Sequence, residues 1–222
     1  METRTAFHKR LREIQDDILA MGSMVSKAIQ RSIEALKNRD LELANHVIDD
    51  DKKIDHKRYE IEEKCVEIIA TQQPMAGDLR IILAVLIIVS EVERIGDYAE
   101  GIAKIAIMIG DEPPLKPLID IPRMADQTVD MLRRALDAFV NRDAETARQI
   151  STEDDAIDHL YDQVFRELLT FMAEDPKTIT RATRLIWVAH NLERAADRVT
   201  NICERVVFVV TGKIEEIGAS KY

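Results

Sequence analysis

The chain has 222 residues, of which 46% are hydrophobic and 32% are charged, and its formal net charge is −10. This acidity argues against nucleic acid as the main partner, because phosphate binding requires a basic surface. Only seven glycines and 5% aromatic residues, beside abundant Ala, Leu, Ile, Glu, Arg and Lys, indicate an all-helical protein.

The N-terminal sequence METRTAFHKRLREIQDD has no apolar stretch of the kind found in a signal peptide. The longest apolar run, 81–89, covers about half of a membrane span. Cys65 and Cys203 form no CxxC motif, which favours a reducing compartment and two small core residues. We therefore expect a cytoplasmic protein that is at most peripheral at the inner face of the membrane, through its partners.

Three long helices are predicted in the first half of the chain. Apolar residues recur in them at alternating spacings of four and three, which marks the stripe, here called the seam, that faces the core of a bundle. The seam of the first helix is Phe7, Leu11, Ile14, Ile18, Met21, Val25, Ala28 and Ser32, and that of the third is Ile81, Val85, Ile88, Val92, Ile95, Ala99, Ile102, Ala106 and Ile109. In the second helix the seam is interrupted by charge, since it reads Val47, Asp51, Ile54, Arg58, Ile61, Cys65 and Ile68.

Four of the six prolines lie in GDEPPLKPLIDIP (110–122), which predicts a linker because helices do not continue through such a sequence. The flanking halves are similar: NRDLELA (38–44) parallels NRDAETA (141–147), and DKKID (51–55) parallels DDAID (154–158). A repeat of this length indicates duplication of a whole unit.

The second half therefore has matching seams. That of its middle helix is Ala147, Ile150, Asp154, Ile157, Tyr161, Val164, Leu168 and Phe171, and that of its last helix is Leu185, Val188, Leu192, Ala195, Val199, Ile202, Val206 and Val209. We predict an all-α fold of two tandem antiparallel three-helix bundles, six long helices in all, related by internal pseudo-symmetry. The predicted divisions are 1–110, a linker at 111–122, and 123–222.

Each repeat carries two pairs of carboxylates at a spacing of i, i+4, which places both members of a pair on one helix face. Four carboxylates converge if the two helices of a repeat are neighbours, and their mutual repulsion then favours a bound cation. An all-carboxylate shell suits hard ions, iron or manganese better than copper. The candidate ligands are Asp51, Asp55, Glu93 and Asp97 in the first repeat, and Asp154, Asp158, Glu193 and Asp197 in the second.

Two alternatives remain open at this point. Arg58, Arg94 and Arg194 lie close enough in sequence to neutralise the carboxylates, which would give a metal-free helical scaffold. A metal-dependent enzyme or a metal store could use the same clusters, although the chain has neither the Glu-x-x-His pattern of di-iron bundles nor a P-loop or nucleophile elbow. We therefore predict a protein that is not an enzyme.

Four further residues are secondary candidates. His190 is spaced to add a nitrogen ligand beside Glu193, whereas Ser90 stands at the matching place in the first repeat. His56 and His159 adjoin the acidic pairs and are expected at the surface. Trp187 is expected in the core or at an interface.

Two longer stretches, DLRIILAVLIIVSEVERIGDYAEGIAK (78–104) and RLIWVAHNLERAADRVTNICE (184–204), resemble the PhoU family of phosphate-uptake regulators. QQPMAGDLR (72–80) and EPPLKPL (112–118) are similar to that family's inter-helix turn and linker. The resemblance implies that the eight carboxylates named above bind metal ions at the surface, including as multinuclear clusters. Iron or zinc is the expected metal, with magnesium or manganese as alternatives.

The resemblance also implies a process. Members of this family restrain the high-affinity phosphate transporter and the phosphate-starvation two-component system. The implied partners are the ATPase subunit of the transporter and the sensor histidine kinase, and a homodimer or oligomer is expected. One departure is that Asn201 fits the family pattern after the second motif whereas Gly101 replaces it in the first, which implies a weaker first site if that Asn holds or orients a ligand.

Overall fold

The computed structural model describes residues 2–217, with side chains from residue 7 onward. Seven α-helices and one short 3₁₀ helix make up this part of the chain: α1 Glu2–Asn38, α2 Leu41–Gln72, α3 Gly77–Ile109, α4 Asp120–Asn141, α5 Ala144–Ser151, α6 Asp154–Glu174, η1 Pro176–Thr178 and α7 Ile179–Thr211. Helix α4 begins inside the predicted linker, and Pro122 lies in its first turn, where the missing N–H group needs no partner.

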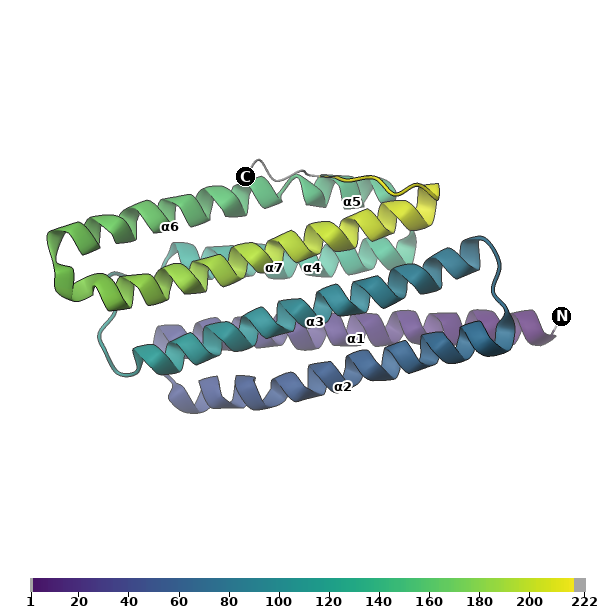
Figure 1. The fold of residues 1–222 in the computed structure, drawn as a ribbon, viewed down its shortest axis with the longest axis horizontal. Helices are drawn as coiled ribbons and strands as arrows, with labels where there is room; N and C mark the ends of the chain where they lie inside the picture. The colour runs from purple at the N-terminus through teal and green to yellow at the C-terminus, as the bar shows by residue number, and fades with distance from the viewer. Residues whose placement is uncertain (1, 218–222) are drawn as a thin grey trace.

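The helices form two layers (Figure 1). Helices α2, α3, α7 and α6 lie side by side, while α1 packs behind the first pair and α4 behind the second. Helices α3 and α7 run antiparallel at the centre and join the two halves, and α1 contacts α4 in the second layer. The predicted architecture of two antiparallel helical bundles in tandem is confirmed.

The repeated sequence NRD forms the same turn in both halves. Arg39 and Arg142 adopt left-handed backbone conformations, with φ of 58° and 56°, which ends the preceding helix. The carboxylates of Asp40 and Asp143 then accept backbone N–H groups from the first turn of the next helix. A duplicated tripeptide thus reverses the chain at equivalent places.

Most residues of the predicted seams are buried. The exceptions are only partly buried, and they are Asp51, Arg58, Ile109, Tyr161 and Phe171. The two central helices bury a second stripe as well, at positions exactly one hundred residues apart in the two repeats. Its members are Ile82, Val89, Gly96 and Ala103 in α3, and Ala182, Ala189, Ala196 and Cys203 in α7. The central position of α3 and α7 explains this, because each is covered on more than one side.

The predicted fifth helix is interrupted. Thr152 and Glu153 form a turn between α5 and α6, where the Thr152 hydroxyl donates to the carbonyl of Gln149 at 2.8 Å. Such local hydroxyl bonds compete with the helical ladder. Arg134 of α4 also holds the Glu153 carboxylate, at 2.8 Å. As a result Asp154 starts α6, where the helix dipole favours a negative charge.

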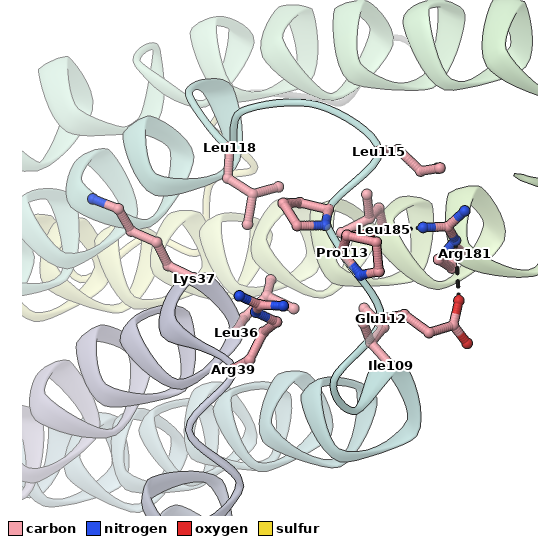
Figure 2. A pocket seen from close by; sticks show the side chains of 11 residues that line it. Leu36, Lys37, Arg39, Ile109, Glu112, Pro113, Leu115, Leu118, Arg181 and Leu185 are labelled. Carbon is pink, nitrogen blue, oxygen red and sulfur yellow. Dashed lines mark hydrogen bonds and ion pairs between the residues drawn. The ribbon is translucent and has the colours of Figure 1, made fainter.

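The linker between α3 and α4 is held by arginines (Figure 2). Arg181 of α7 pairs with Glu112 at 3.0 Å and donates to the carbonyl of Pro113 at 2.6 Å. Arg39 donates to the carbonyl of Asp111 at 3.2 Å. The hollow enclosed by the linker and these helix ends measures about 30 Å³, which is room for one or two water molecules rather than for a substrate.

Both cysteines are buried and free, as predicted for core residues. Burial raises the pKa of the Cys65 and Cys203 thiols to about 12, so neither forms a reactive thiolate at neutral pH. Separately, none of the described helices combines the length and the apolar character needed to cross a membrane.

The contact between α1 and α4 generates a stability prediction. A Cβ atom on Gly22 would lie 2.2 Å from Cδ1 of Leu136, which is buried. We expect Gly22→Val to lower the free energy of unfolding by about 1–3 kcal/mol through overpacking. Leu136→Ala should lower it by about 2–5 kcal/mol through the cavity it leaves. In the double variant the added side chain fills that cavity, so its loss should be smaller than the sum, as urea denaturation would show. Additive losses would mean that the two residues do not share this space.

Candidate metal centre

Three carboxylates from two neighbouring helices converge in the first repeat. Asp51 and Asp55 lie one turn apart on α2, and Asp97 lies on α3. One oxygen atom from each of the three carboxylates lies within 4.8 Å of the other two. Among the side chains of residues 7–217, no other trio of acidic, histidine or cysteine residues approaches so closely. The structure therefore brings together three of the four ligands predicted in this repeat.

Gly96 permits this close approach. A Cβ atom at this position would lie 3.3 Å from the Ile54 side chain and 3.5 Å from Oδ1 of Asp51. The absence of a side chain lets the backbones of α2 and α3 come together beside Asp97. The equivalent residue of the second repeat is Ala196, whose methyl group is buried at the same position.

Glu93, the fourth predicted ligand, is held by an arginine instead. Nη1 of Arg58 lies 2.7 Å from Oε1 of Glu93, and Nε of the same arginine lies 2.8 Å from Glu62. The arginine alternative is thus realised at one carboxylate. Arginine pairing does not neutralise Asp51, Asp55 and Asp97, because no described Lys or Arg nitrogen lies within ion-pair distance of these three side chains.

No ion pair neutralises the trio, and the charge of Arg94 only partly opposes the repulsion at Asp97. Burial raises the pKa of Asp51 to about 7, and the carboxylate of Asp55 adds to the effect. Burial also raises the pKa of Asp97, followed by the charges of Glu93 and Asp55. Both shifts mean that the fold disfavours the ionised carboxylates, and a bound cation would offset that penalty.

The second cluster contains a carboxylate that is almost fully buried. Asp154 is only 8% exposed, and its Oδ1 atom has no hydrogen-bond partner among the described residues. Burial raises its pKa to about 7, with Asp158 the next cause, and burial raises the pKa of Glu193 to the same value, with Asp197 next. A buried oxygen atom without a partner fits a metal ligand, because such atoms are otherwise satisfied in folded proteins.

Asp158 and Asp197 complete this quartet on α6 and α7. Burial raises the pKa of both carboxyls. Arg194 lies 3.4 Å from Asp197 and partly opposes the shift there. The charges of Asp158, Asp197 and Glu193 add to the raised pKa of Asp154. No three of these four carboxylates place oxygen atoms within 4.8 Å of one another, in contrast to the trio of the first repeat.

His190 adds a nitrogen at the edge of the second cluster. Its Nδ1 atom lies 3.1 Å from Oε2 of Glu193. Burial, and then the charge of Arg194, lower the pKa of the imidazole, which favours the neutral form that binds metals. His56 and His159 are exposed, as expected, and His56 pairs with Glu60 at 3.3 Å.

Asn201 lies in the interface between the two central helices. Its amide donates to Glu91 of α3 at 3.2 Å. At the equivalent place of the other repeat, a Cβ atom on Gly101 would lie 3.2 Å from Asn191. The pairs Glu91–Asn201 and Gly101–Asn191 are related by the pseudo-symmetry, so this position contributes to helix packing in both repeats.

The raised pKa values predict how stability depends on pH. An Asp whose pKa is higher in the folded state stabilises the fold at low pH, and this stabilisation is lost as the pH rises through the folded value of about 7. Metal-free protein should therefore lose stability from about pH 4, near the ordinary aspartate pKa of 3.8, to about pH 7, and change little above that. The variant Asp51→Asn/Asp154→Asn should lose most of this dependence and melt roughly 2–4 °C higher at pH 8, which corresponds to about 1 kcal/mol.

Calorimetry in EDTA would measure this difference. Glu63→Gln, at an exposed position of α2, is the matched control and should keep the slope of the parent protein. Equal slopes in the parent and the double variant would show that the two aspartates ionise without penalty.

A family model for the PhoU domain matches residues 18–106 and again residues 121–206, which supports the internal duplication. A PhoU homolog from Aquifex aeolicus, named as a phosphate-specific transport system accessory protein, is 40% identical over 206 residues, or 93% of each chain. The accessory protein PhoU of Escherichia coli is 35% identical and covers 93% of this chain and 86% of its own length.

Solved structures agree with these matches. The crystal structure of PhoU from Pseudomonas aeruginosa superposes with a TM-score of 0.88 at 36% identity, over 93% of this chain and 100% of that one. The phosphate transport system regulatory protein PhoU from Streptococcus pneumoniae gives 0.89 at 29% identity, over 95% and 100%. The chain therefore belongs to the PhoU family.

Proposed function

We propose that this chain regulates phosphate uptake, as an accessory protein that restrains a high-affinity phosphate transporter and the phosphate-starvation response. The observation that carries the proposal is similarity along 93% of the chain to proteins named as phosphate-specific transport system accessory proteins. These relatives are named for an accessory role in transport, which favours a regulator over an enzyme.

The proposed partners are the ATPase subunit of the transporter and the sensor histidine kinase of the two-component system. In this proposal the protein acts at the cytoplasmic face of the membrane, through contacts with these two proteins. The exposed residues along the long helices α2, α3, α6 and α7 would provide the surface for such contacts.

We further propose that both carboxylate clusters hold divalent cations. Support comes from the convergence of Asp51, Asp55 and Asp97, and from the buried oxygen atom of Asp154 that lacks a partner. A cation would supply the positive charge that offsets the repulsion and would tie the two helices of each cluster together. The all-oxygen first cluster suits a hard ion, manganese or iron, whereas His190 would let the second accept zinc or iron.

The two clusters can be separated by mutation. Asp51→Asn/Asp97→Asn should weaken binding at the first cluster at least about tenfold and leave the second unchanged, and Asp154→Asn/Asp197→Asn should do the reverse. Calorimetric titration with Mn²⁺, Fe²⁺ and Zn²⁺, with metal analysis of the purified protein, would measure this. Glu63→Gln, which removes one exposed carboxylate of α2, serves as the control. Identical titrations for all four proteins would place the metal elsewhere or exclude it.

The regulatory proposal has its own test in cells. Deletion of the gene should switch on a phosphate-starvation reporter in phosphate-rich medium, and the parent gene should restore repression. Complementation with Asp51→Asn/Asp97→Asn and with Asp154→Asn/Asp197→Asn would show whether the clusters are needed for repression. A reporter that stays repressed after deletion would contradict the assignment to phosphate control.

A further inference from the structure

An exposed apolar surface adjoins the second cluster. Tyr161, Phe165 and Leu169 follow one another at intervals of four residues along one side of α6, and Trp187 stands on α7. Phe165, Leu169 and Trp187 are 37%, 44% and 50% exposed. The ring of Tyr161 lies 6.2 Å from that of Phe165 and 6.0 Å from His190, so it connects the two helices. Tyr161, Phe165, Leu169 and Trp187 are called the aromatic face below.

The register of the two helices makes this one continuous surface. Helices α6 and α7 run antiparallel (Figure 1). Their pairing is set at one end by the Tyr161–His190 ring contact and at the other by the Thr178 hydroxyl, which donates to the carbonyl of Phe171 at 2.9 Å. Between these two points Trp187 stands nearly level with Phe165. The sequence predicted Trp187 either in the core or at an interface, and its exposed position shows that the core placement was wrong.

The first repeat has different residues at the equivalent positions. These are Arg58, Glu62, Val66 and Ile87, and the first two form an ion pair at 2.8 Å. Both repeats build the same helical hairpin, so the aromatic residues are not required for folding. Large apolar side chains that the fold does not need, gathered on one exposed surface, indicate an interaction site.

Charge limits what can bind there. Helix α6 carries six carboxylates and one arginine. Asp162 pairs with Arg166 at 3.4 Å, Glu167 pairs with Lys116, and Asp154 is buried. The other three carboxylates have no ion pair among the described residues, and they are Asp155, Asp158 and Glu174. The anionic head groups of a membrane would be repelled by this surface. A second copy of the chain would bring two acidic α6 helices together, which like-charge repulsion opposes.

We propose that the aromatic face docks a basic amphipathic helix of a partner protein. The three residues on α6 span about 12 Å, which matches apolar anchors spread over two turns of a partner helix at i, i+3, i+4 and i+7. Lys and Arg residues along the flanks of that helix meet the carboxylates of α6. This inference does not depend on which cellular process the protein controls.

Trp187 is the single tryptophan of the chain and provides a direct reporter. The probe is a synthetic helix of about 18 residues, with Leu at i, i+3, i+4 and i+7 and mainly Lys elsewhere. Binding should shift the emission of Trp187 to shorter wavelength and should saturate. A peptide of the same composition in scrambled order, and one with Glu in place of Lys, should bind at least about tenfold more weakly.

Matched double variants locate the site. Phe165→Ser/Leu169→Ser should weaken binding of the Lys peptide at least about tenfold, because both anchors are lost. Val66→Ser/Ile87→Ser changes exposed apolar residues of the first repeat and should leave binding unchanged. Circular dichroism and unchanged metal titration of each variant would show that the fold and the clusters are intact.

Several outcomes would overturn the proposal. One is equal binding of the scrambled or the Glu peptide, and another is unchanged binding to Phe165→Ser/Leu169→Ser. An emission shift caused by vesicles of phosphatidylcholine and phosphatidylglycerol would assign the surface to a membrane. A dimer in sedimentation that this variant abolishes would assign it to a second copy. The metal titrations and the phosphate reporter test the proposed function separately from these results.

Discussion

Asp51 and Asp154 each place a carboxylate at a position where the bundle otherwise buries an apolar side chain, and both candidate sites depend on this. The next seam residues, Ile54 and Ile157, are fully enclosed. The opposing carboxylates come from α3 and α7, whose own seams are buried, so the helices cannot separate to relieve the repulsion without opening the core. A proton or a cation would relieve the repulsion, and because the pKa of both aspartates is about 7, the proposed cation would compete with protons near neutral pH.

Duplication explains why there are two such sites, and divergence explains why they differ. The antiparallel pair α3 and α7 joins the repeats through equivalent contacts, so the backbone keeps its pseudo-symmetry. The side chains around the carboxylates have changed more freely. Arg58 takes Glu93 out of the first cluster, whereas Tyr161 occupies the equivalent position in the second. The first repeat holds a compact trio of aspartates. The second repeat holds a larger cluster that is bordered by His190 and by the aromatic face.

Periodicity and repetition were sufficient to predict the fold, because the seams and the NRD turns depend on local spacing and on capping. The candidate carboxylates were also found in this way. The distances between them were not, because they depend on the absence of a side chain at Gly96 and on the orientation of Arg58, which no periodicity encodes. The turn at Thr152 lacks the Gly or Pro that usually marks a break. Trp187 could have been placed correctly, since it stands beside Val188 and off the seam.

The proposed cation of the second cluster and the proposed partner helix on the aromatic face would influence each other through charge. The ring centroid of Tyr161 lies 6.0 Å from that of His190, and Nδ1 of His190 lies 3.1 Å from Oε2 of Glu193, so contiguous contacts join the aromatic face to the second cluster. A cation held by Asp154 and Glu193 lowers the negative potential that attracts a basic helix to the aromatic face. Cation and helix would therefore oppose each other, and linkage requires that opposition to be reciprocal. The first repeat has no aromatic face, so a cation held there would act mainly on the stability of α2 against α3. On this reasoning cation occupancy in the second repeat would weaken the binding of a basic partner helix.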